Sequence, residues 1–118
     1  MRSDYMIYAK FDFKDNQYNK FTLSGHAESG PYGHDLVCSA VSALTIGTAN
    51  NLTRLADVHP EINMNEEDGG FLELILPEIS SETQQQTVQI LLASLFYSLT
   101  DIEESYGEFI SVFRTDIL

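Results

Sequence analysis

Residues 25–44 (GHAESGPYGHDLVCSAVSAL) contain the side chains of this chain that are best suited to nucleophilic chemistry. Cys38 is its single cysteine, and we expect it in the first turn of a helix that begins at about Leu36. Free backbone amides and the positive end of the helix dipole stabilise a thiolate, the nucleophilic form of cysteine. The same amides can donate hydrogen bonds to the oxyanion that forms when sulfur attacks a carbonyl carbon. The position therefore indicates a cysteine nucleophile for acyl transfer.

On the expected helix, Cys38 lies beside the apolar stripe and not within it. At about 100° per residue, it falls in line with Ser42, Thr45 and Ala49, a row that is small and partly polar. Ser42 either lines a site or is an ordinary solvated helix serine. Because free cysteines are commonly small buried hydrophobes, position and row alone leave a structural role for Cys38 open.

Three histidines are candidates for the proton acceptor that a thiol nucleophile needs. His26 sits at the end of an expected strand, from which it can face the helix start. His34 lies four residues before Cys38 in the expected loop, where it either swings in or stays exposed. His59 lies past the far end of the helix, and we expect it on the surface. A zinc site from His26, His34, Cys38 and a carboxylate lacks the paired spacing of structural zinc sites, so we expect no metal and no other cofactor.

Asp35 and the glycines of the preceding loop have two interpretations each. As an N-cap, Asp35 would accept hydrogen bonds from the first-turn amides and so place Cys38. As an orienting partner of His26, it would complete a triad, and the sequence does not distinguish the two roles. Gly30 and Gly33 are either ordinary loop breakers or the flexible points of a lid that refolds around a bound peptide.

Hydrophobic periodicity predicts the elements that position these residues. Alternating apolar residues over 5–13, and again at Phe21 and Leu23, predict two half-buried strands that a turn at 15–17 joins into a hairpin. Apolar residues at spacings of three and four then predict a helix over 36–56. Its stripe consists of Val37, Val41, Leu44, Thr48, Leu52 and Leu55.

The second half of the chain adds two strands, a helix and a final strand. We expect a weak strand from Ile62, a turn at 68–70, a strand over 71–76, a helix from about Ser81 to Glu104 and a strand over 108–114. The order ββαββαβ predicts an α+β fold, a two-layer α/β sandwich with a mostly antiparallel sheet and both helices on one face. A chain of 118 residues suits a single domain, 1–118.

The charge of the chain is strongly negative and unevenly distributed. Its 18 acidic and 6 basic side chains give a net charge of −12, and residues 61–118 contain a single base, Arg114. This charge argues against direct binding of nucleic acid or of an anionic membrane, whereas a basic partner stays open. With no signal-peptide pattern, no apolar stretch of about 20 residues and a lone cysteine, we expect a cytoplasmic protein.

The segment from Gly25 to Leu44 resembles the bacterial ribosomal-processing cysteine protease family. The resemblance rests on the triplet G-H-A at 25–27, the glycines at 30 and 33, and D-L-V-C-S-A-V-S-A-L over 35–44. The family's usual form of the last run is D-I-V-C-A-A-V-S-A-L, from which Leu36 and Ser39 depart conservatively. The whole chain matches the family in length and element order, but the specificity lies in this segment.

The resemblance implies a cysteine endopeptidase with Cys38 as nucleophile and His26 as general base and acid, because His34 falls where the family pattern is loose. It implies that the substrate is a basic large-subunit ribosomal protein precursor, whose short N-terminal extension is removed to support ribosome assembly. It also implies a homodimer and a loop before Cys38 that is mobile without substrate. The acidic second half of the chain would help to hold the basic segment of the substrate.

Two other functions are compatible with the sequence. One is a non-enzymatic acidic adaptor that binds a basic ribosomal protein and needs no reactive thiol. The other is a cysteine hydrolase that uses the same dyad on another substrate. Rapid and selective labelling of Cys38 near neutral pH favours the enzymes over the adaptor.

Overall fold

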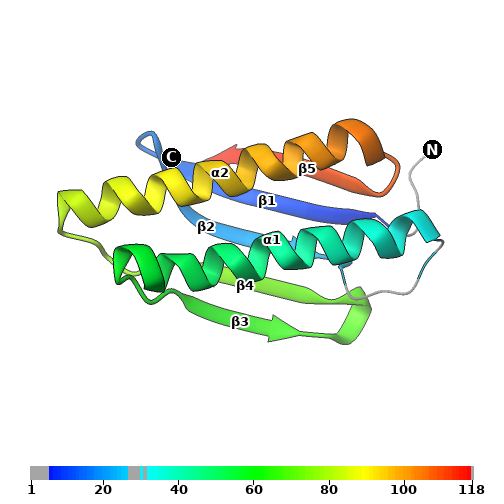
Figure 1. Ribbon diagram of the computed structural model, residues 1–118, viewed down its shortest axis with the longest axis horizontal. Coiled ribbons are helices and arrows are strands. Elements are labelled where there is room, and N and C mark those ends of the chain that lie inside the picture. The colour runs from blue at the N-terminus through cyan, green and yellow to red at the C-terminus, as the bar shows by residue number, and fades with distance from the viewer. Residues whose placement is uncertain (1–5, 27–29, 31, 118) are drawn as a thin grey trace.

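Five strands and two long helices form the part of the chain that the computed structural model describes, residues 6–26, 30 and 32–117 (Figure 1). In chain order they are β1 (Ile7–Lys14), β2 (Gln17–Ser24), α1 (Tyr32–Ala56), β3 (Glu61–Asn65), β4 (Phe71–Ile75), α2 (Glu82–Tyr106) and β5 (Ile110–Asp116), with the short 3-10 helix η1 (Glu67–Gly69) between β3 and β4. The predicted order ββαββαβ is therefore confirmed.

The strands form a single mixed sheet in the order β3-β4-β2-β1-β5. β1 is antiparallel to β2, β2 to β4 and β4 to β3, whereas β5 runs parallel to β1. Asp15 and Asn16 both have positive φ angles, as the two-residue turn of a tight hairpin requires. The predicted α+β sandwich with a mostly antiparallel sheet is confirmed.

Both helices cover the same face of the sheet (Figure 1). α1 connects β2 to β3, and α2 connects β4 to β5, and each connection joins two strands that run in the same direction. The two connections start from antiparallel neighbours and lead to opposite edges of the sheet. Because such crossovers are almost always right-handed, this topology requires both helices on one face.

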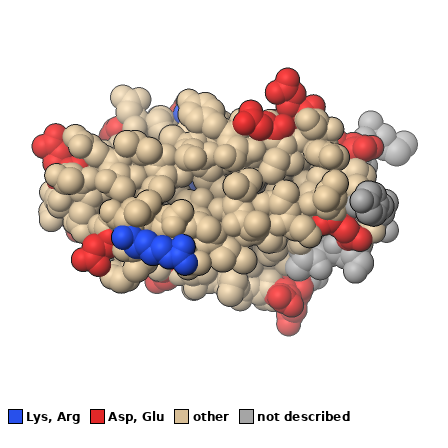
Figure 2. All heavy atoms as spheres, viewed as in Figure 1, with Lys and Arg blue, Asp and Glu red and all other residues tan. Residues whose placement is uncertain are grey.

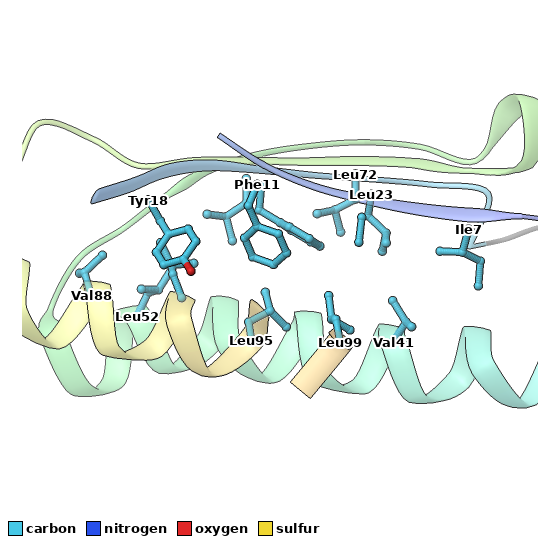
Figure 3. Close-up of a cluster of buried hydrophobic side chains, with 14 of the residues drawn as sticks. Ile7, Phe11, Tyr18, Leu23, Val41, Leu52, Leu72, Val88, Leu95 and Leu99 are labelled. Carbon is cyan, nitrogen blue, oxygen red and sulfur yellow. The ribbon is translucent and has the colours of Figure 1, made fainter. Parts of the chain in front are cut away.

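The core lies between the sheet and the two helices. Figure 3 shows Phe11 and Leu23 of the sheet pointing toward Leu95 and Leu99 of α2 and Val41 of α1, and all five side chains are buried. Buried and more exposed residues alternate as predicted from Ile7 to Phe11 and at Phe21 and Leu23. At the end of β1 the prediction fails, since Asp12 is buried and Phe13 half-buried where the β1–β2 register shifts.

Gln89 attaches α2 to the sheet through two hydrogen bonds. The amide N–H of Tyr18 donates to Gln89 Oε1 at 2.7 Å, and Gln89 Nε2 donates to the carbonyl oxygen of Tyr18 at 2.8 Å. At its start, α2 is capped by Ser81, whose side chain accepts a hydrogen bond from the amide of Gln84. The predicted start of this helix near Ser81 is confirmed.

α1 begins one turn earlier than the sequence predicts. It starts at Tyr32 and not near Leu36, so Cys38 lies in its second turn and Asp35 lies inside its first turn, exposed. The predicted N-cap role of Asp35 is therefore wrong. The reason lies at Gly33, which we expected in the loop: a Cβ atom there would lie 2.5 Å from Cε2 of Phe109. Packing against Phe109 uses the missing side chain and extends the helix through a residue of poor helix propensity.

The buried stripe of α1 also differs from the predicted one at its C-terminal end. Leu55 is 63% exposed, whereas Thr45 and Ala56 are buried. Val37, Val41 and Leu52 are buried as predicted, and Leu44 and Thr48 are half-buried. Because α1 packs beside α2 as well as over the sheet, its buried surface does not follow one narrow stripe.

Replacement by alanine should change the free energy of unfolding in opposite directions at Gly25 and Gly47. Gly25 has φ +83°, and a Cβ there would clash with the carbonyl oxygen of Met6, so Gly25→Ala should lower the free energy of unfolding by more than about 1 kcal/mol. Gly47 is inside α1 with nothing within 4 Å of an added Cβ, so Gly47→Ala should raise it by about 0.5–1 kcal/mol. Urea unfolding of both variants measures the difference, and equal effects of the same sign would contradict this account.

Candidate active site

The Cys38 thiol lies on α1, partly exposed at the edge of the core. Helical side chains point back toward the N-terminus and lie over the preceding turn. The residue one turn before Cys38 is His34, and the sulfur lies 3.5 Å from His34 Nδ1 and 3.6 Å from His34 Nε2. α1 itself therefore brings a thiol and an imidazole into contact.

His34 is not the loop residue that the sequence predicts. It lies in the first turn of α1 and is 0% exposed. Its ring packs edge-on against Phe109, with the ring centres 6.1 Å apart. Phe109 is held in turn by backbone hydrogen bonds, since its amide donates to the carbonyl of Tyr106 and its own carbonyl accepts from the amide of Ile7. The start of β5 thus fixes the ring of His34.

His26 lies just after the end of β2, as predicted, and lines a cavity of about 190 Å³ beside α1. The cavity is lined by Leu23, His26, Ser42, Thr45, Ile46, Met64, Glu66 and Leu72. Among the described residues, none forms a hydrogen bond with the buried Nδ1 atom of His26. The imidazole therefore has a ring nitrogen available for another group.

Ser42 relates the position of His26 to that of Cys38. It lies one turn after Cys38 on the same side of α1, about 6 Å along the helix axis, and lines the cavity together with His26. The structure therefore places His34 against Cys38 and His26 beside the next turn. Ser42 is half-buried and belongs to this cavity, which favours the interpretation in which it lines a site.

The His26 side chain is suited to accept a proton near neutral pH. Burial lowers the pKa of the imidazole below its ordinary value of 6.5, because a charged ring loses hydration there. The Glu66 carboxylate raises the pKa, but by less than burial lowers it. The neutral form therefore predominates at pH 7, and protonation sets in only as the pH falls below 6.5.

The other residues that the sequence singled out, Gly30, Gly33 and Asp35, lie at or just before the start of α1. Gly30 is half-buried in the segment before α1, and Gly33 lies inside the helix and not in a loop. Within the described part of the chain, no hydrogen bond reaches Nδ1 of His26, so the alternative interpretation, in which Asp35 orients His26, finds no contact at that atom. Asp35 instead places a carboxylate in the first turn of α1, where the helix dipole stabilises it.

The early start of α1 also changes the expected oxyanion site. Only the first four amides of a helix lack an intrahelical acceptor. Because α1 begins at Tyr32, the amide of Cys38 lies inside the helix and is not one of these four. The predicted free amides beside Cys38 are therefore wrong, and the free ones lie a turn earlier.

A second cavity continues the first along α1 toward the edge strand β3. It has a volume of about 160 Å³ and a mostly apolar lining of Thr45, Ile46, Ala49, Asn50, Ile62, Met64, Leu72 and Leu74. Thr45, Ile46, Met64 and Leu72 line both cavities. We call the two together the α1–β3 groove. The sequence indicated it only indirectly, through the apolar residues of the weak strand at Ile62 and Met64.

His34 was the residue near the thiol that sequence reasoning placed wrongly. A signal was present, because His34 precedes Val37 by three residues and Val41 by seven and so extends the buried stripe by one turn. His59 is exposed, as predicted, and its Nε2 lies 3.3 Å from Asp57 Oδ1.

Metal binding and membrane insertion find no support in the described ranges. No three His, Cys, Asp or Glu side chains among those residues gather closely enough to hold a metal ion. Over the same ranges, neither helix combines the length and the apolar character needed to cross a membrane.

The pKa of His26 gives a test of this geometry. In a pH titration by NMR, the ring resonances of His26 should show a midpoint below 6.5, and Glu66→Gln should lower that midpoint further, because it removes the charge that favours the imidazolium. The ring resonances of the exposed His59, past the far end of α1, serve as an internal reference. An upward shift of the His26 midpoint in Glu66→Gln would show that the two groups are not arranged as described.

Comparison with known proteins identifies relatives over most of the chain. The sequence model of the family described as Cysteine protease Prp matches residues 6–111. The ribosomal processing cysteine protease Prp of Staphylococcus aureus (strain NCTC 8325 / PS 47) is 37% identical over 87 residues, which cover 73% of this chain and 76% of the relative. The protein of the same name from Bacillus subtilis (strain 168) is 34% identical over 88 residues, covering 75% and 78%.

Solved structures agree in fold. A crystal structure of a Streptococcus mutans protein superposes with a TM-score of 0.87 at 34% identity, covering 95% of this chain and 96% of that one. The essential ribosomal processing protease Prp from S. aureus, in complex with a substrate peptide, has a TM-score of 0.80 at 30% identity, covering 93% and 100%. The same S. aureus protease has also been solved with a covalently linked product peptide, at a TM-score of 0.76 and 31% identity.

Proposed function

Because the chain belongs to the cysteine protease Prp family, we propose that it is an endopeptidase that removes a short N-terminal extension from a large-subunit ribosomal protein precursor. The observation that carries this proposal is the partly exposed thiol of Cys38, placed on α1 with one imidazole in contact and a second beside the next turn. The S. aureus relative, whose complexes contain a substrate peptide and a covalently linked product, supports it. In this role the protein acts in the cytoplasm, where ribosomal proteins are made.

We assign the general base and acid to His26 and not to His34. The group must first take a proton from the thiol, then give one to the leaving amine and finally activate water, so it has to reach substrate and solvent. His34 is 0% exposed behind Phe109 and cannot meet a leaving group. His26 lines a cavity and has a lowered pKa that keeps it neutral, which supports the assignment.

The reaction then proceeds by acyl transfer. Cys38 transfers its proton to His26, and the thiolate attacks the scissile carbonyl carbon to form a C–S bond. The C–N bond breaks as the His26 imidazolium protonates the amine, which leaves as the mature protein with its new N-terminus. Water, deprotonated by His26, then attacks the thioester carbon to form a C–O bond. The C–S bond breaks, the extension leaves as a carboxylic acid, and the Cys38 thiolate takes the proton back from His26. No cofactor is needed for these steps.

The charges near the site suit a basic substrate segment. Asp35 at the start of α1 and Glu66 and Glu67 after β3 place exposed carboxylates on both sides of the region that holds Cys38 and His26. These attract the cationic residues that follow the cleavage site in the proposed precursor, an interaction that salt weakens.

The α1–β3 groove suits the part of the substrate that precedes the cleavage site. The resemblance to the family implies a substrate that is cut after an aromatic-rich stretch. The groove is lined by Ile46, Ile62 and Met64, which are exposed apolar side chains. β3 is an edge strand, so an extended peptide beside it would find unpaired backbone groups. The groove reaches the cavity of His26, which places such a peptide next to the catalytic groups.

Incubation with the precursor of the basic ribosomal protein, followed by mass spectrometry of the products, tests the proposal. Cys38→Ala should lower the cleavage rate by about 10³-fold or more, because no other group supplies the nucleophile. His26→Ala should lower it by about 10²- to 10⁴-fold. His59→Ala, at the far end of α1, is the matched control and should cleave like the parent protein.

The outcomes separate this function from its alternatives. Cleavage by Cys38→Ala would exclude Cys38 as the nucleophile. Tight binding of the precursor without cleavage, together with an inert thiol, would instead support the acidic adaptor. A reactive thiol with no processing of this precursor would indicate a cysteine hydrolase with another substrate.

We also propose that the protein is a homodimer. α1 and α2 expose large apolar side chains on the outer surface of the helix layer, Leu55 at 63%, Ile90 at 69% and Tyr97 at 62%. Figure 2 shows that the middle of this face carries few charges, while carboxylates lie around its margin. Sedimentation equilibrium should give twice the 13.3 kDa mass of the chain, and Tyr97→Glu should shift the protein toward the monomer. A monomer that is fully active would exclude this proposal.

A further inference from the structure

His34 is a fully buried titratable side chain that the mechanism above does not use. An imidazole costs free energy when it leaves water, unless its polar atoms find partners. Its two ring nitrogens lie 3.5 Å and 3.6 Å from the Cys38 sulfur, within hydrogen-bond distance for a sulfur acceptor. The contact therefore offsets part of the cost of burial and links His34 to the proposed nucleophile.

The geometry of this pair does not depend on the segment that precedes α1. The two residues are one turn apart on the same helix, so the helix backbone sets their separation. Phe109 packs against the ring of His34 and against the bare Cα of Gly33, which prevents the ring from turning away. The sulfur is nearly equidistant from both nitrogens and so lies off the Cε1 edge of the ring between them, where a small rotation of the thiol toward the protonated nitrogen makes an N–H···S hydrogen bond in either neutral tautomer.

We propose that His34 is a positioning residue for Cys38, one that donates an N–H hydrogen bond to the sulfur and stabilises the thiolate before attack. This inference rests on the proposed role of Cys38 as nucleophile. The proton of the thiol still goes to His26, and His34 keeps its own proton throughout. His34 acts only through Cys38, because its full burial keeps it from substrate.

Three elements near His34 carry further titratable side chains among the described residues. On α1, Asp35 is adjacent in sequence but exposed, and solvent screens its charge. In the segment before β5, Tyr106 and Glu108 flank Phe109 and are also exposed. On β1, Tyr8 follows Ile7 and points to the opposite face of the sheet from it.

The test is the pH dependence of the alkylation of Cys38 by iodoacetamide, without substrate. His34→Leu keeps an apolar side chain against Phe109 but removes both nitrogens, so the midpoint of the alkylation profile should rise by about one pH unit. Below both midpoints, this corresponds to an approximately tenfold slower alkylation. His34→Gln keeps an N–H donor, so its alkylation midpoint should lie between those of the parent protein and His34→Leu. His59→Ala is the control, and its alkylation profile should be unchanged. A folded His34→Leu protein with an unchanged midpoint would overturn the proposal.

A second measurement does not require any change of the buried histidine. In the parent protein, the NMR resonance of the His34 ring should shift as Cys38 titrates, and Cys38→Ala should abolish that shift. If the His34 resonance depends on pH in the same way with and without the Cys38 thiol, the proposal is overturned, even if His34→Leu fails to fold.

Cleavage assays on the same variants separate this inference from the proposed function. His34→Leu should process the precursor more slowly at neutral pH and recover as the pH rises, whereas His26→Ala should stay impaired at all pH values. If no variant and no parent protein cleaves the precursor, the proposed function fails, while the shift in the alkylation midpoint still decides the role of His34.

Discussion

The packing of Phe109 against the first turn of α1 is the contact on which the geometry of the site depends. Phe109 precedes β5 and is held by backbone hydrogen bonds to Tyr106 and Ile7. Its ring occupies the space that a side chain at position 33 would fill and lies edge-on to His34. It thereby holds the first turn of α1 in helical form and His34 in its buried position. The C-terminal strand thus positions the helix that carries the thiol.

The two histidines near Cys38 differ because their environments differ. His34 lies in the first turn of α1, where its side chain is buried and packed against the ring of Phe109, just before β5. His26 follows β2 and lines a cavity, where burial and the opposing charge of Glu66 set its pKa. One imidazole is rigid and out of reach of substrate, and the other is accessible and neutral. This contrast in exposure, more than distance to the sulfur, is the basis on which we propose a supporting role for His34 and proton transfer for His26.

The negative charge of the chain is unevenly distributed over its surface. On the face that carries the helices, carboxylates lie around the margin and the middle is largely uncharged (Figure 2). Near the site, Asp35, Glu66 and Glu67 are exposed, and Glu66 lines one end of the α1–β3 groove. An apolar groove that ends near carboxylates fits a peptide with apolar residues on one side of the scissile bond and basic residues on the other.

The sequence by itself determined the order of the elements, the tight turn at Asp15 and Asn16, the buried faces of β1 and β2, and the segment that identifies the family. These features arise from local periodicity, turn chemistry and spacing along the chain, which one sequence displays directly. The start of α1, the burial of His34 and the groove beside β3 were decided only by the tertiary structure. Each depends on a partner distant in sequence: Phe109 packs against Gly33, and Met64 and Leu72 face α1. Local propensity would begin α1 after Gly33, and packing against Phe109 extends the helix back to Tyr32.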